Sequence, residues 1–248
     1  MQPVIRFPLG ILVLFLAACT QTLQIEPPRH IDPQAAALEA EQTDRYWWQL
    51  RFKLTWPDDE EPEFSRHLLI AEQILLPVIA AHESEMPLWR FHRRAGRDRA
   101  GHQFSLIFYS GEVTARQVET EVTTNPLSQW LLDQNMIEKT RFGRRSLEEL
   151  GQLEDTSDEN WPPEIKRSWP WFIMGASQGW LLLVQELSAE SELDPQVDYP
   201  GLLAHYREVD SRLNTQWRDY GQHAYLHHLS AIFGYQPVRV RSRELMRF

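Results

Sequence analysis

A serine between two glycines, Ser177, has the surroundings of a catalytic nucleophile. Residues 175–179 read Gly-Ala-Ser-Gln-Gly, the G-x-S-x-G pattern in which a tight turn between a strand and a helix exposes a reactive hydroxyl. Acidic residues and His223 follow it in the chain order that a Ser–acid–His triad on this motif takes. Apolar residues at helical spacing continue on both sides of Ser177, however, and Trp180 stands where close packing needs a small residue. We therefore expect a non-catalytic helix here, with a serine hydrolase that uses Ser177 and His223 as the alternative.

A second candidate site contains Asp219, His223 and His227. Their spacing of four residues places all three on adjacent turns of one helix, and neutral imidazoles with a carboxylate suit zinc. The pattern lacks a His-Glu-x-x-His core, and a further strong ligand would have to come from elsewhere in the chain. We expect no metal and no cofactor, and keep a zinc site at these three residues as the alternative.

The third candidate site is a basic face on a predicted sheet. Residues 46–56, 88–93 and 104–109 alternate between apolar and polar, which indicates half-buried strands. One face of these strands carries Arg51, Lys53, Arg90, His92 and Tyr109. Such a surface in an acidic protein can hold an anion, for example a lipid headgroup or an acidic glycan. The competing interpretation, which we favour at this point, is that the acidic residues 147–235 cover this face, because sheet faces are normally covered.

The elements that position these residues follow one another in a recognisable order. A helical stripe over 64–82 follows the first strand, and a hairpin of the strands 88–93 and 104–109 comes next. A helix over 113–122, a new turn capped at Asn125, and a fourth strand over 136–142 complete the set. This βαββαβ order predicts an α+β protein whose residues 43–145 form a ferredoxin-like half.

Residues 146–248 predict a mainly helical half that packs on the first half as one unit. One helix is expected to start at a Ser168 cap, and a second near Pro200 to end at Gly234. The basic residues 237–248 suggest a single edge strand.

The start of the chain resembles the leader of bacterial lipoproteins. A short apolar run from Ile11 ends in Leu16-Ala17-Ala18-Cys19, which is similar to a lipobox, and the run is too short to cross a bilayer, which takes about 20 apolar residues. The resemblance implies a signal peptide over 1–18, acylation of Cys19 with fatty acids such as palmitate, and a tether over 19–42. Because Thr20 rather than Asp follows the cysteine, it also implies an outer-membrane lipoprotein that faces the periplasm.

Composition limits the possible functions. The chain has 248 residues, a net charge of −10 and 42% hydrophobic residues, so a sizeable core is possible and nucleic acid is an unfavourable partner. We expect a lipid-anchored protein of the cell envelope that is non-catalytic and binds an envelope protein or an anionic envelope ligand, with the membrane as a partner through the lipid.

Overall fold

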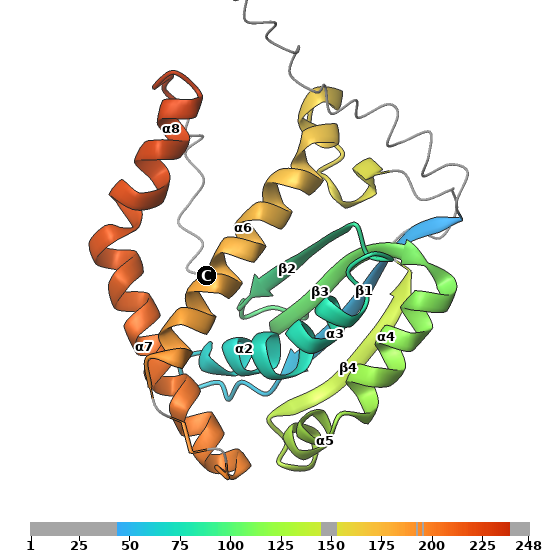
Figure 1. Cartoon of the computed structure of the whole chain (residues 1–248), viewed down its shortest axis with the longest axis vertical. Helices are drawn as coiled ribbons and strands as arrows, with labels where there is room; N and C mark the ends of the chain where they lie inside the picture. The colour runs from blue at the N-terminus through green and yellow to red at the C-terminus, as the bar shows by residue number, and fades with distance from the viewer. Residues whose placement is uncertain (1–43, 145–152, 192, 195, 239–248) are drawn as a thin grey trace, which may run out of the picture. The chain divides into compact units, whose positions relative to one another are not determined.

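A four-stranded antiparallel sheet lies at the centre of the residues that the computed structural model describes, which are 44–144, 153–191, 193–194 and 196–238 (Figure 1). The strand order is β2-β3-β1-β4. The strands are β1 (Arg45–Leu54), β2 (Leu88–Arg94), β3 (His102–Gly111) and β4 (Ile137–Arg144). Helices accompany the sheet, so the prediction of an α+β protein is confirmed.

The alternation in the sequence sets which face of the sheet is buried. Leu50 and Phe52 of β1, with Phe104 and Leu106 of β3, are 0% exposed and form the centre of the core. The helices over this face are α2 (Ser65–Leu69), η1 (Ile70–Leu75), α3 (Leu76–Ala81), α4 (Glu112–Thr124) and α5 (Pro126–Asp133). The first three run without a break, which confirms the helix predicted over 64–82 and adds a π-helical turn before Pro77. Asn125 caps α5 as expected, because its Oδ1 accepts from Leu127 N at 2.9 Å.

The second half of the described chain is helical. It contains η2 (Leu153–Thr156), α6 (Pro163–Ala189), α7 (Tyr199–Gly221), η3 (Gln222–His227) and α8 (His228–Ile232). The prediction that Ser168 caps a helix is wrong: α6 begins at Pro163, since proline is favourable in the first helical turn. The predicted end signal is confirmed, because Gly234 has a left-handed φ of +64° and Tyr235 N donates to Ser230 O.

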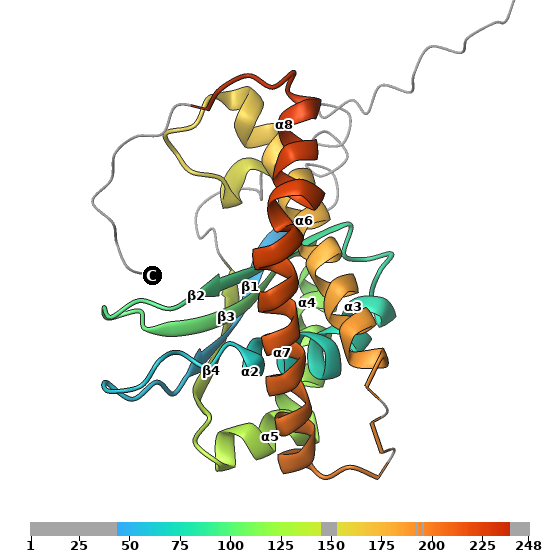
Figure 2. The same cartoon turned by 90° about the vertical axis from the view of Figure 1, so that its left-hand side faces the viewer.

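The two halves share one core. Leu181, Val184 and Tyr206, from α6 and α7, belong to the same buried cluster as Leu50 and Phe52 of the sheet. Helix α6 contacts β2, and α7 runs beside both α6 and α2 (Figures 1 and 2). Figure 2 shows η3 and α8 continuing from α7 beyond the sheet, and no residue of these two segments is buried.

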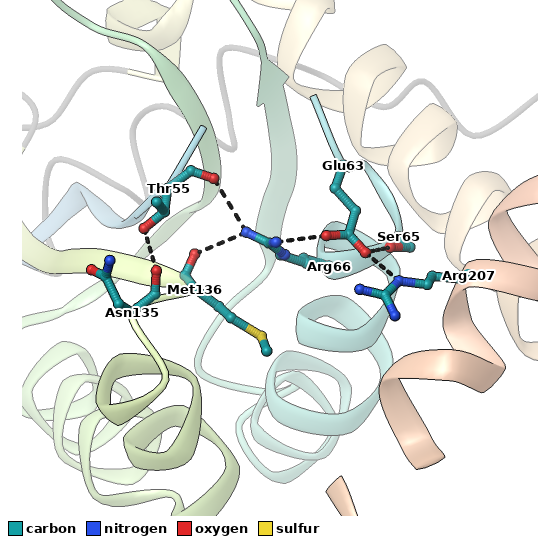
Figure 3. Close-up of polar contacts among 7 residues, drawn as sticks. All are labelled: Thr55, Glu63, Ser65, Arg66, Asn135, Met136 and Arg207. Carbon is teal, nitrogen blue, oxygen red and sulfur yellow. Dashed lines mark hydrogen bonds and ion pairs between the residues drawn. The ribbon is translucent and has the colours of Figure 1, made fainter. Parts of the chain in front are cut away.

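Arg66 forms a polar link between segments that are distant in sequence (Figure 3). Its Nη1 donates to Thr55 O at 3.2 Å and to Met136 O at 3.4 Å, which joins the end of β1 to the start of β4. Its Nη2 lies 2.6 Å from Glu63, and the same carboxylate accepts from Arg207 Nε of α7 at 2.6 Å. The Arg66–Glu63–Arg207 group therefore fixes α7 to the sheet.

Several predicted features lie outside the described residues. These are the signal peptide over 1–18, Cys19, the tether over 19–42 and most of the strand expected over 237–248. Among the described residues, no helix is both long and apolar enough to cross a membrane.

Candidate functional site

The face of the sheet that turns away from α2 to α5 has a covered end. Trp47 and Tyr109 are 1% and 2% exposed there, and their rings are 5.2 Å apart. They form a small second core with Leu88, Ile107, Leu153 of η2 and the partly buried Met174 of α6. The expectation that the helical half covers this face is therefore correct for this end of the sheet.

Two of the five residues predicted to bind an anion lie at this covered end. Arg90 is 7% exposed, and Tyr109 packs against Trp47, so neither side chain is presented to solvent. His92, further along β2, is exposed. Arg51 and Lys53 of β1 are half-buried at the opposite end of the same face.

At this open end the sheet carries a hollow of about 560 Å³ with a basic lining. The lining residues are Arg51, Lys53, Arg99, Ala100, Gln103, Lys139 and Arg141. The strand register explains this composition, because Arg51 of β1 stands directly opposite Arg141 of β4, and Lys53 stands opposite Lys139. Directly opposed residues in an antiparallel pair have Cβ atoms about 5 Å apart, and like charges in that arrangement are destabilising. An anion placed between them relieves the repulsion.

A chain of hydrogen bonds holds Arg51 in this position. Its Nη2 donates to Gln49 Oε1 at 2.7 Å, and Gln49 Nε2 donates to Ser105 Oγ at 3.2 Å. Ser105 is fully buried, so the chain is anchored in the sheet. The partners are neutral, and Arg51 Nε has no hydrogen-bond partner in the described part of the chain. No carboxylate is among these partners, so they do not offset the positive charge of the guanidinium.

One carboxylate neutralises part of the positive charge that lines the hollow. The register of β1 with β4 shifts between Lys53 and Leu54, and Glu138 at this irregularity lies 2.7 Å from Lys53 Nζ. Within the described ranges, Arg51, Lys139 and Arg141 form no ion pair with any carboxylate. The hollow therefore has a surplus of positive charge although the chain carries a net charge of −10.

Ser177 does not form a nucleophile elbow. It lies in the middle of α6, is 6% exposed, and its Oγ donates to Ile173 O of the preceding helical turn at 2.8 Å. The same oxygen accepts from Phe91 N of β2 at 3.1 Å. The motif requires a strand, a turn and a helix, and α6 offers one continuous helix instead, so the hydrolase alternative is wrong in its geometry. Ser177 has a structural role, because its hydroxyl accepts a hydrogen bond from the backbone N–H of Phe91 on the outer edge of β2.

The proposed zinc ligands do not assemble into a site. The described residues contain no group of three or more His, Cys, Asp or Glu side chains that could hold a metal ion. Asp219 Oδ1 accepts from Arg218 Nε at 3.0 Å, and His223 and His227 are exposed. The two imidazole rings, both on the π-helical segment η3, lie 5.5 Å apart at an interplanar angle of 9°. Stacked rings do not direct their nitrogens at one point.

A buried pair of histidines, His67 of α2 and His102 of β3, is a further unusual polar feature of the described chain. The rings are 4.6 Å apart, and His67 Nδ1 accepts from Arg93 Nε at 3.1 Å. Burial, with the nearby charges of Arg66 and Arg93, lowers the pKa of His102 to about 4. Burial and the same two cations also hold the pKa of His67 well below its ordinary value. Both imidazoles are therefore neutral, and Arg93 beside them makes the site unfavourable for a metal cation.

Comparisons with protein-family models, curated proteins and solved structures give no match for this chain. Lys139 and Arg141 are not among the residues predicted from the sequence to bind an anion, although alternation in the predicted strand over 136–142 places both on one face. The signal that could have found them is the pairing of the fourth strand with the first.

Proposed function

We propose that the protein is a non-catalytic binding module of the cell envelope that holds an anionic partner at the open, basic end of its sheet. The observation that carries this proposal is the strand register, which places two pairs of like charges opposite each other, Arg51 with Arg141 and Lys53 with Lys139. They line one hollow with Arg99. Such an arrangement costs free energy in the isolated protein, and a bound anion recovers it.

The pre-orientation of Arg51 supports the proposal. A side chain that is already held by Gln49 loses less conformational entropy when it binds, and arginine presents a planar fork to carboxylate or phosphate oxygens. Gln103, which is 8% exposed, adds a polar group to the floor of the hollow. The ligand class is therefore an anion with carboxylate or phosphate groups.

Retention on immobilised heparin, used as a general polyanion, tests this function. We expect the double variant Arg51→Gln/Arg141→Gln to elute at a clearly lower NaCl concentration than the unchanged protein, since surface charge interactions are screened by salt. The matched control is Arg167→Gln/Arg218→Gln, which removes the same charge from the helical half and should elute unchanged. Equal losses in both variants, or no retention of the unchanged protein, would contradict the proposal.

We also propose that Cys19 is acylated and anchors the module to the outer membrane, facing the periplasm. The support is the lipobox-like Leu16-Ala17-Ala18-Cys19 and the Thr20 that follows it. Two or more acyl chains on one cysteine give stable anchoring, because each buried methylene contributes about 0.8 kcal/mol. Cys19→Ala should abolish labelling by a fatty-acid probe and release the protein from the membrane fraction; unchanged labelling would refute acylation.

We further infer that residues 43–145 form a ferredoxin-like half. The order of elements, β1, the α2–α3 helix, β2, β3, the α4–α5 helices and β4, supports this inference, as does the sheet order β2-β3-β1-β4. In this arrangement β4 lies beside β1, which brings Lys139 and Arg141 next to Lys53 and Arg51.

A further inference from the structure

The two edges of the sheet are protected very differently. At one edge α6 lies against β2, and Ser177 of α6 accepts the outward Phe91 N–H. At the other edge β4 pairs with β1 alone in the part of the chain that the structure describes. An uncovered edge strand presents unpaired N–H and C=O groups that can pair with another extended chain.

The side chains of β4 are exposed on the basic face of the sheet and half-buried on its core face. Lys139 and Arg141 are exposed on the basic face. Thr140 and Phe142 point to the core face, opposite Phe52 and Leu50 of β1. Their partners on β1 are fully buried, whereas Thr140 and Phe142 are only half-buried, and the guanidinium carbon of Arg116 of α4 lies 5.4 Å from the centre of the Phe142 ring.

We propose that β4 is the docking edge for an extended acidic segment of a partner protein, which adds to the sheet as a fifth strand. The inference rests on the proposed function and names its ligand class. Alternate residues of a strand share a face and are about 7 Å apart, and directly opposed residues are about 5 Å apart. Two carboxylates at positions i and i+2 of the added strand therefore stand beside Lys139 and Arg141.

The residue between the two carboxylates points to the other face. There it lies beside Thr140 and Phe142, where the ring of Phe142 stacks on Trp48 at 5.4 Å. An apolar, β-branched residue fits this position, because such side chains pack well on a half-buried pleated surface. The partner segment is thus expected to alternate acidic and apolar residues.

Charge also decides against a second copy of this chain as the occupant. Two β4 edges brought together would place Lys139 and Arg141 of one copy against the same cations of the other. Charged residues on an edge strand prevent such self-association. The same cations favour a strand of opposite charge, so the charge complementarity selects an acidic partner.

The experiment uses the full chain and synthetic peptides. The test peptide is acetyl-Thr-Val-Asp-Val-Asp-Val-Thr-amide, with its carboxylates at i and i+2. The matched control is acetyl-Thr-Asp-Val-Val-Asp-Val-Thr-amide, which has the same composition but places the two carboxylates on opposite faces. Two further versions of the test peptide carry backbone N-methyl groups at odd or at even residues, and each blocks hydrogen bonding on one side of the strand. Binding is measured by fluorescence anisotropy of labelled peptides.

We expect the test peptide to bind at least about tenfold more tightly than the control, with one N-methylated version losing binding and the other retaining it. Lys139→Gln/Arg141→Gln should remove the preference; both positions are exposed, so the variant should fold.

Two results would overturn the inference. If all four peptides bind alike and the double variant weakens them equally, the hollow holds anions without strand addition, and the proposed function stands alone. If no peptide binds while heparin retention persists, the partner is not an acidic strand. If neither the peptides nor heparin bind, both proposals fail.

Discussion

Replacing Ser177 with alanine tests whether this residue seals the edge of the sheet. The backbone N–H of Phe91 in β2 donates to Ser177 Oγ at 3.1 Å, and α6 covers this strand. The change to alanine removes that acceptor. A buried donor left without a partner costs about 1–3 kcal/mol. Alanine is a better helix former than serine by about 0.5 kcal/mol, which offsets part of the loss. The expected net change in the free energy of unfolding is therefore about −1.5 kcal/mol.

For a chain of this length that loss corresponds to a Tm lower by about 3–6 °C. Ser168→Ala is the matched control, since Ser168 lies in the same helix, is exposed, and also donates its hydroxyl to a carbonyl of the preceding turn, Ile165 O at 3.1 Å. Ser168 has no strand donor to satisfy, so its replacement should leave Tm unchanged or slightly raised. Thermal unfolding followed by circular dichroism measures both variants.

Equal Tm values for Ser177→Ala and Ser168→Ala would refute this role for Ser177. Labelling of Ser177 by a fluorophosphonate probe would also contradict it, because a hydroxyl that is 6% exposed and bonded on both sides is neither accessible nor activated.

Two further predictions concern pH and the link between the halves. The pKa of His102 is about 4 in the folded protein against an ordinary 6.5, so the unfolded chain binds the proton more readily and the free energy of unfolding falls as pH drops from 6.5 to 4. His102→Phe should flatten that part of the curve of urea midpoint against pH, and an unchanged curve would count against the burial of His102. Burial alone would raise the pKa of Glu63, but the hydrogen bond from Arg207 and the charges of Arg66 and Arg207 outweigh burial and lower it. The ionised Glu63 carboxylate therefore stabilises the folded protein at neutral pH, and this contribution is lost as the pH falls. Glu63→Gln should cost about 1 kcal/mol at neutral pH and less in acid, measured by urea unfolding; a loss independent of pH would contradict this assignment.

Local patterns in the sequence predict the elements well. Alternation places Leu50 and Phe52 on the buried face of a strand, and the Asn125-Pro126 pair marks the start of a helix, as the structure confirms. These features depend on a few neighbouring residues. The sequence analysis predicts a helix start at Ser168, whereas α6 begins at Pro163, since proline in the first turn is also a start signal.

The site depends on contacts that local patterns do not contain. Arg51 and Arg90 share a face in the sequence pattern and in the structure, yet one is half-buried beside a hollow and the other is covered. Which part of the face is covered depends on where η2 and α6 pack. The pairing of Arg51 with Arg141 joins residues that are far apart in the chain, and the register of two distant strands cannot be read from either strand alone.

The covering of β2 by α6 also sets an order of events during synthesis. Phe91 emerges before Ser177, which follows 86 residues later in the chain. The β2 edge and the Phe91 ring, which contacts Trp180 of α6, therefore stay uncovered by α6 while the rest of the chain is made. Translation at about 5–20 residues per second makes this interval several seconds long. A chain that halts before α6 exposes an unpaired strand edge, which promotes aggregation. Holding the chain unfolded until α6 is complete would avoid this hazard.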